Sequence, residues 1–326
     1  MSNDAVLEIV DLHVQFKVYG GLLRVLDGVD LLIRSKEKVG LVGETGCGKT
    51  ITLKTAIRVL PSPPCKIPRG EILFQGQDIL KMSRKELQYF RGKKIAMIPQ
   101  DPTASLNPVF KIGTQLTDAI KYSAGSKKNL TKKRILDKAI GILKEVGLPD
   151  VMRNMNSYPI QLSGGMKQRI LIAMALVAEL DLLFADEPTT ALDVTIQDQI
   201  LRLMHALVDR RQVAMLLISH NLGTIRESTD ITYIMYAGQI VEVAETEKIF
   251  SDPLHPYTKA LISSVPKLTG GGISPGIPGM IPNYMQPPRG CRFQPRCDHA
   301  TNACMQKPPL QQIAGDHKVA CFLYQK

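Results

Sequence analysis

One glycine-rich segment constrains the fold of this chain more than any other. Residues 39–50 read Val-Gly-Leu-Val-Gly-Glu-Thr-Gly-Cys-Gly-Lys-Thr, between an apolar strand-like run and a helix-like run. This order is typical of a phosphate-binding loop, in which backbone N–H groups and the start of the following helix face phosphate oxygens. We expect Lys49 to reach the β- and γ-phosphates and Thr50 to hold Mg²⁺. The predicted nucleotide contacts are Gly43, Glu44, Thr45, Gly46, Cys47, Gly48, Lys49, Thr50 and Ile51.

Several short apolar runs end in residues that can do chemistry. Residues 39–42 lead into the loop, 95–98 into Gln100, 182–185 into Asp186-Glu187, and 214–219 into His220. Continuous apolar runs suit parallel strands that are buried on both faces. Functional groups at the carboxyl ends of such strands are typical of an open α/β sheet. The sequence therefore predicts an α/β P-loop NTPase core.

The two carboxylates after the third run are expected to do different work. Asp186 would hold Mg²⁺, and Glu187 would orient and deprotonate the attacking water. A helix N-cap with an acidic first turn is the structural alternative. That alternative explains one acid, but it does not explain an Asp-Glu-Pro sequence that follows an apolar run and a phosphate loop.

A second phosphate cradle is predicted at Leu-Ser-Gly-Gly, residues 162–165. Ser163 is a good N-cap, and Gly164 and Gly165 leave backbone N–H groups accessible at the positive end of a helix. One nucleotide does not need two cradles from one chain. We therefore expect this cradle to serve the nucleotide of a neighbouring subunit.

The remaining sequence divides by pattern. Residues 6–17 and 25–34 alternate and predict an antiparallel β layer, and residues 102–165 predict an inserted helical subdomain. Residues 233–236 and 239–243 predict a hairpin. Beyond residue 250, frequent prolines and the glycines at 270–272 predict an irregular extension. The expected domains are an ATP-binding domain over 1–250 and an extension over 251–326.

The net charge of +11 suggests an anionic partner. Part of it lies at residues 121–138, where a solvated helix face with mild attraction to a membrane is favoured over nucleic-acid binding. No apolar stretch approaches the roughly 18 residues of a membrane span, and the N-terminus does not resemble a secretory signal. We expect a soluble intracellular protein that does not bind nucleic acid.

Four cysteines gather near the C-terminus. They are Cys291, Cys297, Cys304 and Cys321, with five, six and sixteen residues between them. Clustered thiols in an intracellular chain favour a metal over disulfides. The spacing lacks the tight pairs of most zinc sites and is compatible with an iron–sulfur cluster. Iron–sulfur, zinc and free or disulfide-bonded cysteines all remain open from spacing alone.

The order of these motifs resembles that of the nucleotide-binding subunits of ATP-binding-cassette (ABC) transporters, over about residues 5–250. The resemblance implies that two cassettes pair head to tail around ATP. It implies that Gln100 contacts the metal or water, that Asp193 in Ala191-Leu192-Asp193 bridges the cassettes, and that His220 contacts the γ-phosphate. Phe16 or Tyr19 would stack on adenine. Met166 and Thr190 depart from the commonest family residues, but neither departure removes a catalytic group.

The C-terminal part is similar to the extension of the oligopeptide and dipeptide importer branch. The similarity lies in residues 255–258, 277–282 and 290–297. It implies a [4Fe–4S] cluster on the four cysteines, with Zn²⁺ as the alternative. It also implies an ATPase subunit at the cytoplasmic face of the membrane, with a second, non-identical ATPase, two membrane-spanning permease subunits and an extracytoplasmic peptide-binding protein. Import of nickel or sugar-derived compounds, or a nucleic-acid-linked ABC ATPase, are the alternatives.

Overall fold

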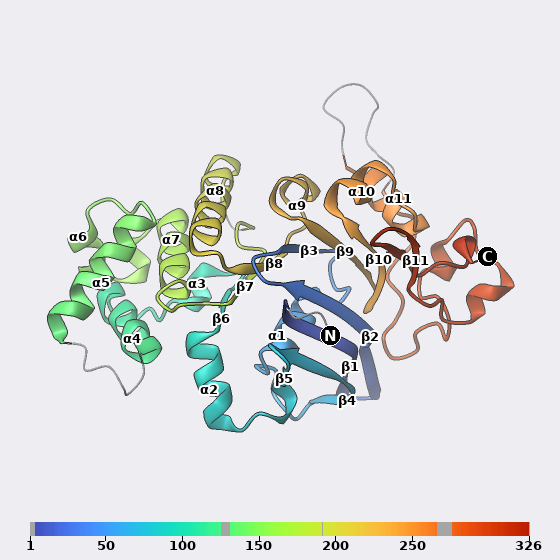
Figure 1. The fold of residues 1–326 in the computed structure, drawn as a ribbon, viewed down its shortest axis with the longest axis horizontal. Coiled ribbons are helices and arrows are strands. Elements are labelled where there is room, and N and C mark those ends of the chain that lie inside the picture. The colour runs from blue at the N-terminus through green and yellow to red at the C-terminus, as the bar shows by residue number, and fades with distance from the viewer. Residues whose placement is uncertain (1–3, 125–130, 191, 266–275, 326) are drawn as a thin grey trace. The chain divides into compact units, whose positions relative to one another are not determined.

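The computed structural model describes residues 4–124, 131–190, 192–265 and 276–325, and the chain divides into two compact units (Figure 1). The first unit comprises Met1–Lys81 and Leu216–Lys326, and the second comprises Met82–Met215. Parts of three expectations lie outside the described residues. These parts are Lys127 and Lys128 of the basic stretch, Ala191 of the Ala-Leu-Asp motif, and Pro266, Gly270–272 and Pro275 of the extension. The division at residue 250 remains a prediction.

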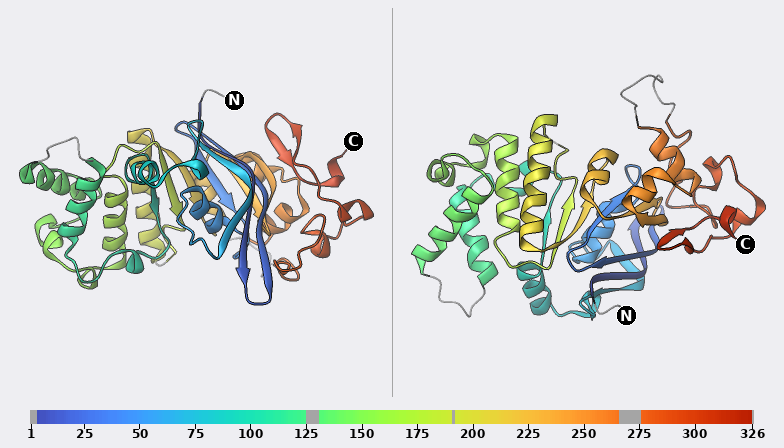
Figure 2. Two further views of the ribbon diagram at one scale, coloured as in Figure 1. Left: turned by 90° about the horizontal axis from the view of Figure 1, so that it is seen from below. Right: turned by 45° about the horizontal axis from the view of Figure 1, so that its top comes forward.

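The first unit contains an antiparallel sheet with the strand order β2-β1-β4-β5. Its strands are β1 (Ala5–Val18), β2 (Gly21–Arg34), β4 (Cys65–Phe74) and β5 (Gln77–Asp78). Figure 2 shows β1 and β2 as a long twisted hairpin. The most deeply buried side chains of β1 are Leu7 and Ile9 before Asp11, and Leu12 and Val14 after it. At Asp11 φ is 46° and the register with β2 shifts. This β-bulge lets one strand keep its apolar side chains on one face although their spacing in the sequence changes.

The second sheet in this unit has the order β11-β12-β10-β9-β3, followed by β8 (Ala214–Ile218), which spans the boundary between the units. Parallel β3 (Lys38–Val42) and β9 (Ile231–Tyr236) lie side by side. β9 and β10 (Gln239–Glu245) form the predicted hairpin. Its turn residues Ala237 and Gly238 both have positive φ, as a tight two-residue hairpin turn requires.

The C-terminal extension is less irregular than the sequence predicts. Helix α11 (Pro256–Ser263) begins with a proline at its first position, where a missing N–H removes no helical hydrogen bond, and His255 caps it. Strands β11 (Gln311–Ala314) and β12 (His317–Val319) add to the second sheet through β10. The prediction of a wholly irregular extension was therefore wrong. The other helices of this unit are α1 (Lys49–Ala56), η1 (Ile79–Lys81), α9 (Leu222–Ser228), α10 (Thr246–Ser251), η3 (Gln294–Arg296), η4 (Asn302–Met305) and η5 (Phe322–Tyr324).

The second unit contains parallel strands β6 (Ile95–Ile98) and β7 (Leu182–Asp186). Between these two strands, the described residues form helices and no strand. Helix α5 buries Ile135, Ala139, Ile142 and Leu143, the spacing of one helical face. The helices of this unit are α2 (Arg84–Lys93), α3 (Pro102–Ser105), α4 (Ile112–Ala124), α5 (Lys132–Glu145), α6 (Val151–Asn156), η2 (Pro159–Gln161), α7 (Gly164–Ala175) and α8 (Val194–Arg211).

Within the described ranges, no helix is both long enough and apolar enough to cross a membrane.

Candidate nucleotide-binding site

The phosphate loop lies between β3 and α1, as the sequence predicts. Two positions in the loop require glycine. A Cβ on Gly43 would lie 2.0 Å from the carbonyl oxygen of Met235. Gly48 has a φ of 113°, a conformation that residues with a side chain rarely adopt. Thr45 and Gly46 are exposed at the tip. The loop therefore combines close packing at its base with an accessible backbone at its tip.

Lys49 is the first residue of α1, and its side chain turns back over the loop. Its Nζ atom donates hydrogen bonds to the carbonyl oxygens of Gly43 (2.7 Å) and Glu44 (3.0 Å). These bonds satisfy the buried ammonium group of Lys49. Phosphate oxygens would offer the same ammonium group a charged acceptor, which makes a stronger hydrogen bond than a carbonyl does.

Cys47 lies in the loop as a small buried residue. Its side chain is fully buried, and this burial raises the pKa of its thiol, although nearby Lys49 acts in the opposite direction. A neutral, inaccessible thiol is a poor nucleophile. The structure therefore favours a packing role over the alternative of a reactive, acidic cysteine.

Gln100 and Glu187 are brought together at the carboxyl ends of two parallel strands. Ile98 of β6 is in register with Ala185 of β7, so the residues that follow both strands emerge at one edge. Gln100 Nε2 donates a 2.8 Å hydrogen bond to Glu187 Oε2. Asp186 is the last residue of β7 and is almost fully buried. This arrangement gives Glu187 a fixed orientation, which a general base requires.

Thr190 contacts Glu187, a role that its difference from the commonest family residue does not predict. Its Oγ1 donates a 3.0 Å hydrogen bond to Glu187 Oε2, and its N–H donates to the Glu187 carbonyl oxygen. Pro188 follows Glu187 in this turn, a favoured position for proline. Glu187 itself has a φ of 48°, which is unusual for a non-glycine residue and typical of strained functional positions. The spacing of three residues between Glu187 and Thr190 is the sequence feature that could have predicted this contact, because it suits a tight turn.

Ser163 caps helix α7, as predicted. Its Oγ atom accepts a hydrogen bond from the N–H of Met166 at 3.3 Å. Ser163 and Gly164 are exposed, whereas Gly165 packs closely enough that a Cβ would lie 2.9 Å from Ile196 Cγ2. The start of α7 thus presents backbone N–H groups that a ligand from outside can reach.

Two further predicted residues lie at the ends of secondary-structure elements. Asp193 is exposed and precedes α8, and its carboxylate accepts no capping hydrogen bond from the described first turn of that helix. His220 is exposed two residues after β8 ends. Both are placed where a charged ligand or a partner can reach them.

The two candidates for adenine stacking have different environments. Phe16 is half-buried within β1, and Tyr19 is fully exposed in the turn between β1 and β2. A stacking platform needs an exposed ring face, which Tyr19 offers more fully.

Comparison with known proteins decides the family. The sequence model described as ABC transporter matches residues 26–190, and the one described as oligopeptide/dipeptide transporter, C-terminal region, matches residues 241–304. The chain belongs to the ABC transporter family. It is 43% identical to the oligopeptide transport ATP-binding protein OppD of Bacillus subtilis, over 97% of this chain and 88% of that protein. It is 42% identical to the dipeptide transport ATP-binding protein DppD of the same species, over 98% and 95%.

The fold of this ABC ATPase is also similar to that of a solved cassette. The dimeric, ADP- and phosphate-bound cassette MJ0796 matches with a TM-score of 0.65 and 22% identity, over 74% of this chain and 98% of that one. At this identity the likeness concerns the fold alone. It is the ABC ATPase fold that the P-loop predicts.

The four C-terminal cysteines of this ABC protein all line one cavity of about 290 Å³. Each is a half-buried free thiol. His255 and His299, neither of which the sequence predicts as a ligand, line the same cavity. Burial raises the pKa of Cys291 to about 11 and raises the pKa of Cys297 and Cys321. A cationic group would therefore be needed to hold these sulfurs as thiolates.

The geometry of this cavity bears on the metal prediction. In the described part of the chain, no three His, Cys, Asp or Glu side chains converge closely enough to hold one metal ion. By its chemistry, a set of four cysteine thiolates suits either a zinc ion or an iron–sulfur cluster. Metal binding at these cysteines therefore stays a prediction.

Proposed function

We propose that this chain is the ATPase subunit of an importer of di- or oligopeptides. The observation that carries the proposal is the match of residues 241–304 to the oligopeptide/dipeptide transporter C-terminal region. The names of the relatives support the same substrate class. Nickel and sugar-derived compounds are the alternative cargoes.

The ATP site is proposed to work through the residues that the sequence indicates. Lys49 and the loop amides would bind the phosphates, and Tyr19, or else Phe16, would stack on adenine. Thr50, Gln100 and Asp186 would hold Mg²⁺, which would supply positive charge to the phosphate oxygens. Glu187, oriented by Gln100 and Thr190, accepts the proton of the attacking water, and His220 contacts the γ-phosphate.

The proposed partners are those that the family resemblance implies, and the second cradle at Ser163 to Gly165 supports the first of them. A second, similar but non-identical ATPase subunit supplies its own cradle to this chain's ATP, and Asp193 lies at the junction. Two membrane-spanning permease subunits bind the pair at the cytoplasmic face of the membrane, and an extracytoplasmic binding protein delivers the peptide. ATP binding closes the pair and hydrolysis reopens it, a shift between two populations.

The cargo is tested by reconstituting the chain with its permease partners and binding protein in lipid vesicles. We expect a di- or oligopeptide on the binding protein to raise ATP hydrolysis several-fold, because ligand binding shifts the transporter toward its closed state. Nickel and a disaccharide serve as matched controls. Stimulation by either control, with none by peptides, would overturn the peptide assignment while leaving the ATPase assignment intact.

The four cysteines are proposed to hold a [4Fe–4S] cluster, and the alternative is Zn²⁺. Such a group would cross-link an extension that has little apolar core of its own. We expect anaerobically purified protein to contain iron and sulfide in equal amounts, and Cys291→Ser to lose both. The measurement is metal and sulfide analysis of the two proteins, with Cys65→Ser as the control. Zinc without iron in the wild type would refute the cluster.

A further inference from the structure

The phosphate loop is held by three side chains from the C-terminal extension. Arg296 donates two hydrogen bonds to the carboxylate of Glu44, at 2.7 and 3.0 Å. The hydroxyl of Tyr284 donates to the carbonyl oxygen of Gly46 at 2.7 Å, and the hydroxyl of Tyr257 accepts from the N–H of Glu44 at 2.9 Å. Two of the loop residues, Glu44 and Gly46, are therefore fixed by residues more than 200 positions away in the sequence.

These side chains are themselves firmly packed. Tyr257 is fully buried, and its ring lies 4.6 Å from that of Tyr236 and 5.4 Å from that of Phe293. The side chain of Arg296 is 5% exposed and also donates to the carbonyl oxygens of Ile277 and Pro278. Buried, bidentate arginine–carboxylate contacts are among the stronger polar interactions in proteins.

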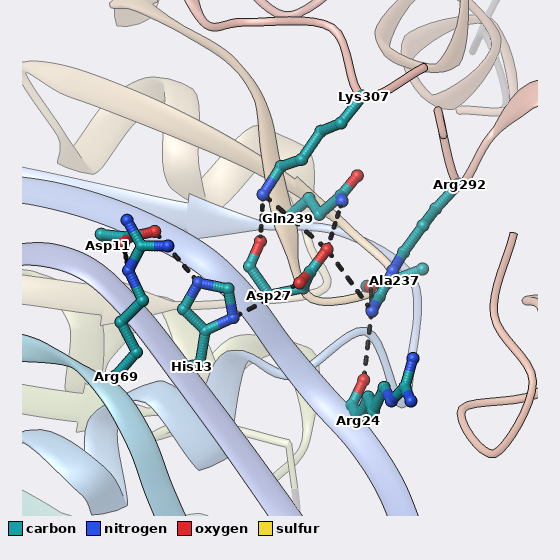
Figure 3. A network of polar contacts seen from close by, with 9 residues as sticks. All are labelled: Asp11, His13, Arg24, Asp27, Arg69, Ala237, Gln239, Arg292 and Lys307. Atoms are coloured by element: carbon teal, nitrogen blue, oxygen red, sulfur yellow. Dashed lines mark hydrogen bonds and ion pairs between the residues drawn. The ribbon is translucent and has the colours of Figure 1, made fainter. Parts of the chain in front are cut away.

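The extension is anchored to the β1–β2 layer as well as to the loop (Figure 3). Arg292 is buried, lies 3.6 Å from the carboxylate of Asp27 in β2, and donates to the carbonyl oxygens of Arg24 and Ala237. Lys307 donates to the carbonyl oxygen of Asp27 at 2.7 Å. Burial alone would raise the pKa of Asp27, but the two cations lower it overall. The contacts to the loop therefore come from a segment that is fixed at two places.

The contact to Gly46 fixes the orientation of a peptide group within the phosphate loop. Because a peptide bond is planar and trans, its C=O and N–H point in opposite directions. Tyr284 holds the Gly46 carbonyl oxygen, and the N–H of Cys47 in the same peptide group donates across the loop to the carbonyl oxygen of Glu44 at 3.2 Å. Tyr284 therefore helps to fix the backbone of the loop whose N–H groups would bind phosphate.

The contact to Glu44 concerns charge. A carboxylate within a phosphate loop repels the triphosphate, and the guanidinium of Arg296 neutralises it. Arg296 immediately precedes Cys297, so the segment that lines the cysteine cavity also carries this contact.

We propose that Arg296 and Tyr284 are positioning residues for nucleotide binding, through which the C-terminal extension sets the affinity of the phosphate loop for MgATP. The proposal rests on the assignment of this loop as the ATP site. It assigns to the peptide-importer extension a part in the ATP site that the cassette residues alone do not supply.

The test is the dissociation constant of MgATP for the complete chain, measured by calorimetry. We expect Arg296→Gln to weaken binding about tenfold and Tyr284→Phe, which removes a single hydroxyl, about fivefold. Arg226→Gln is the matched control, because Arg226 makes a similar two-point contact to Glu247 in the same unit, away from the loop. We expect the control to bind MgATP like the wild type.

A double variant separates charge neutralisation from general damage to the fold. Glu44→Gln combined with Arg296→Gln removes the carboxylate together with its partner, so we expect it to recover most of the lost affinity. Wild-type affinity in both Arg296→Gln and Tyr284→Phe would overturn the proposal, and so would a double variant as weak as Arg296→Gln alone. Failure of the wild type to bind MgATP would instead refute the ATP site itself.

Discussion

Replacing Glu187 with glutamine is expected to lower ATP hydrolysis by the assembled transporter by about a hundredfold or more, because general-base catalysis contributes that much. The amide is the same size as the carboxylate, and its oxygen can still accept the hydrogen bonds from Gln100 and Thr190. It cannot accept the proton of the attacking water. The measurement is phosphate release by wild-type and variant complexes at saturating MgATP.

Binding must be separated from chemistry in this experiment. We expect Glu187→Gln to bind MgATP at least as tightly as the wild type, because one negative charge near the phosphates is removed. Lys49→Ala is the matched control, and it is expected to lose binding and hydrolysis together. Undiminished turnover by Glu187→Gln would refute the assignment of Glu187 as the base.

A substitution at the second cradle is expected to affect the partner's nucleotide and not this chain's own. Gly164 is exposed at the first position of α7, where an aspartate favours the helix because it complements the helix dipole. In Gly164→Asp the same carboxylate would repel a γ-phosphate that approaches from the partner. We expect hydrolysis at that site to fall by about a hundredfold, the effect of losing comparable phosphate-stabilising donors.

The decisive readout for Gly164→Asp is the contrast between two measurements. The affinity of the isolated chain for MgATP should equal that of the wild type, whereas the assembled complex should lose hydrolysis at the partner's site. Gly164→Asn, which places a side chain of the same size at the same position without adding charge, is the control for damage to α7. Weakened MgATP binding by the isolated Gly164→Asp chain would show that the second cradle serves the chain's own nucleotide.

Local patterns were sufficient to predict the parts of the site that lie next to strands. The apolar runs before Gln100 and Glu187 predicted two parallel strands, and parallel register then places both residues at one edge of the sheet. Ser163 is predictable as a cap because serine is favoured at the position before a helix, where its hydroxyl accepts a hydrogen bond from a backbone N–H of the first turn. Each strand and the cap depend on residues that are close together in the chain, whereas the pairing of the two strands brings together Gln100 and Glu187, which are 87 positions apart.

Other features depend on contacts that no local pattern encodes. The hydroxyl of Tyr284 and the carbonyl oxygen of Gly46 are separated by 238 positions, and Arg296 and Glu44 by 252. Helix α11 was missed because Pro256 was interpreted as a sign of irregular structure, although proline is favoured at the first position of a helix. The bulge at Asp11 was missed because its alternation changes phase within one strand.

The central claim is that this chain contributes half of each ATP site, and one measurement tests it most directly. The specific ATPase activity of the isolated chain is followed over a range of protein concentrations, and then after addition of its partner ATPase and permease subunits. We expect MgATP binding with little hydrolysis at low concentration, and a strong rise in activity when the partners are added. High specific activity that does not change with concentration or partners would contradict the account.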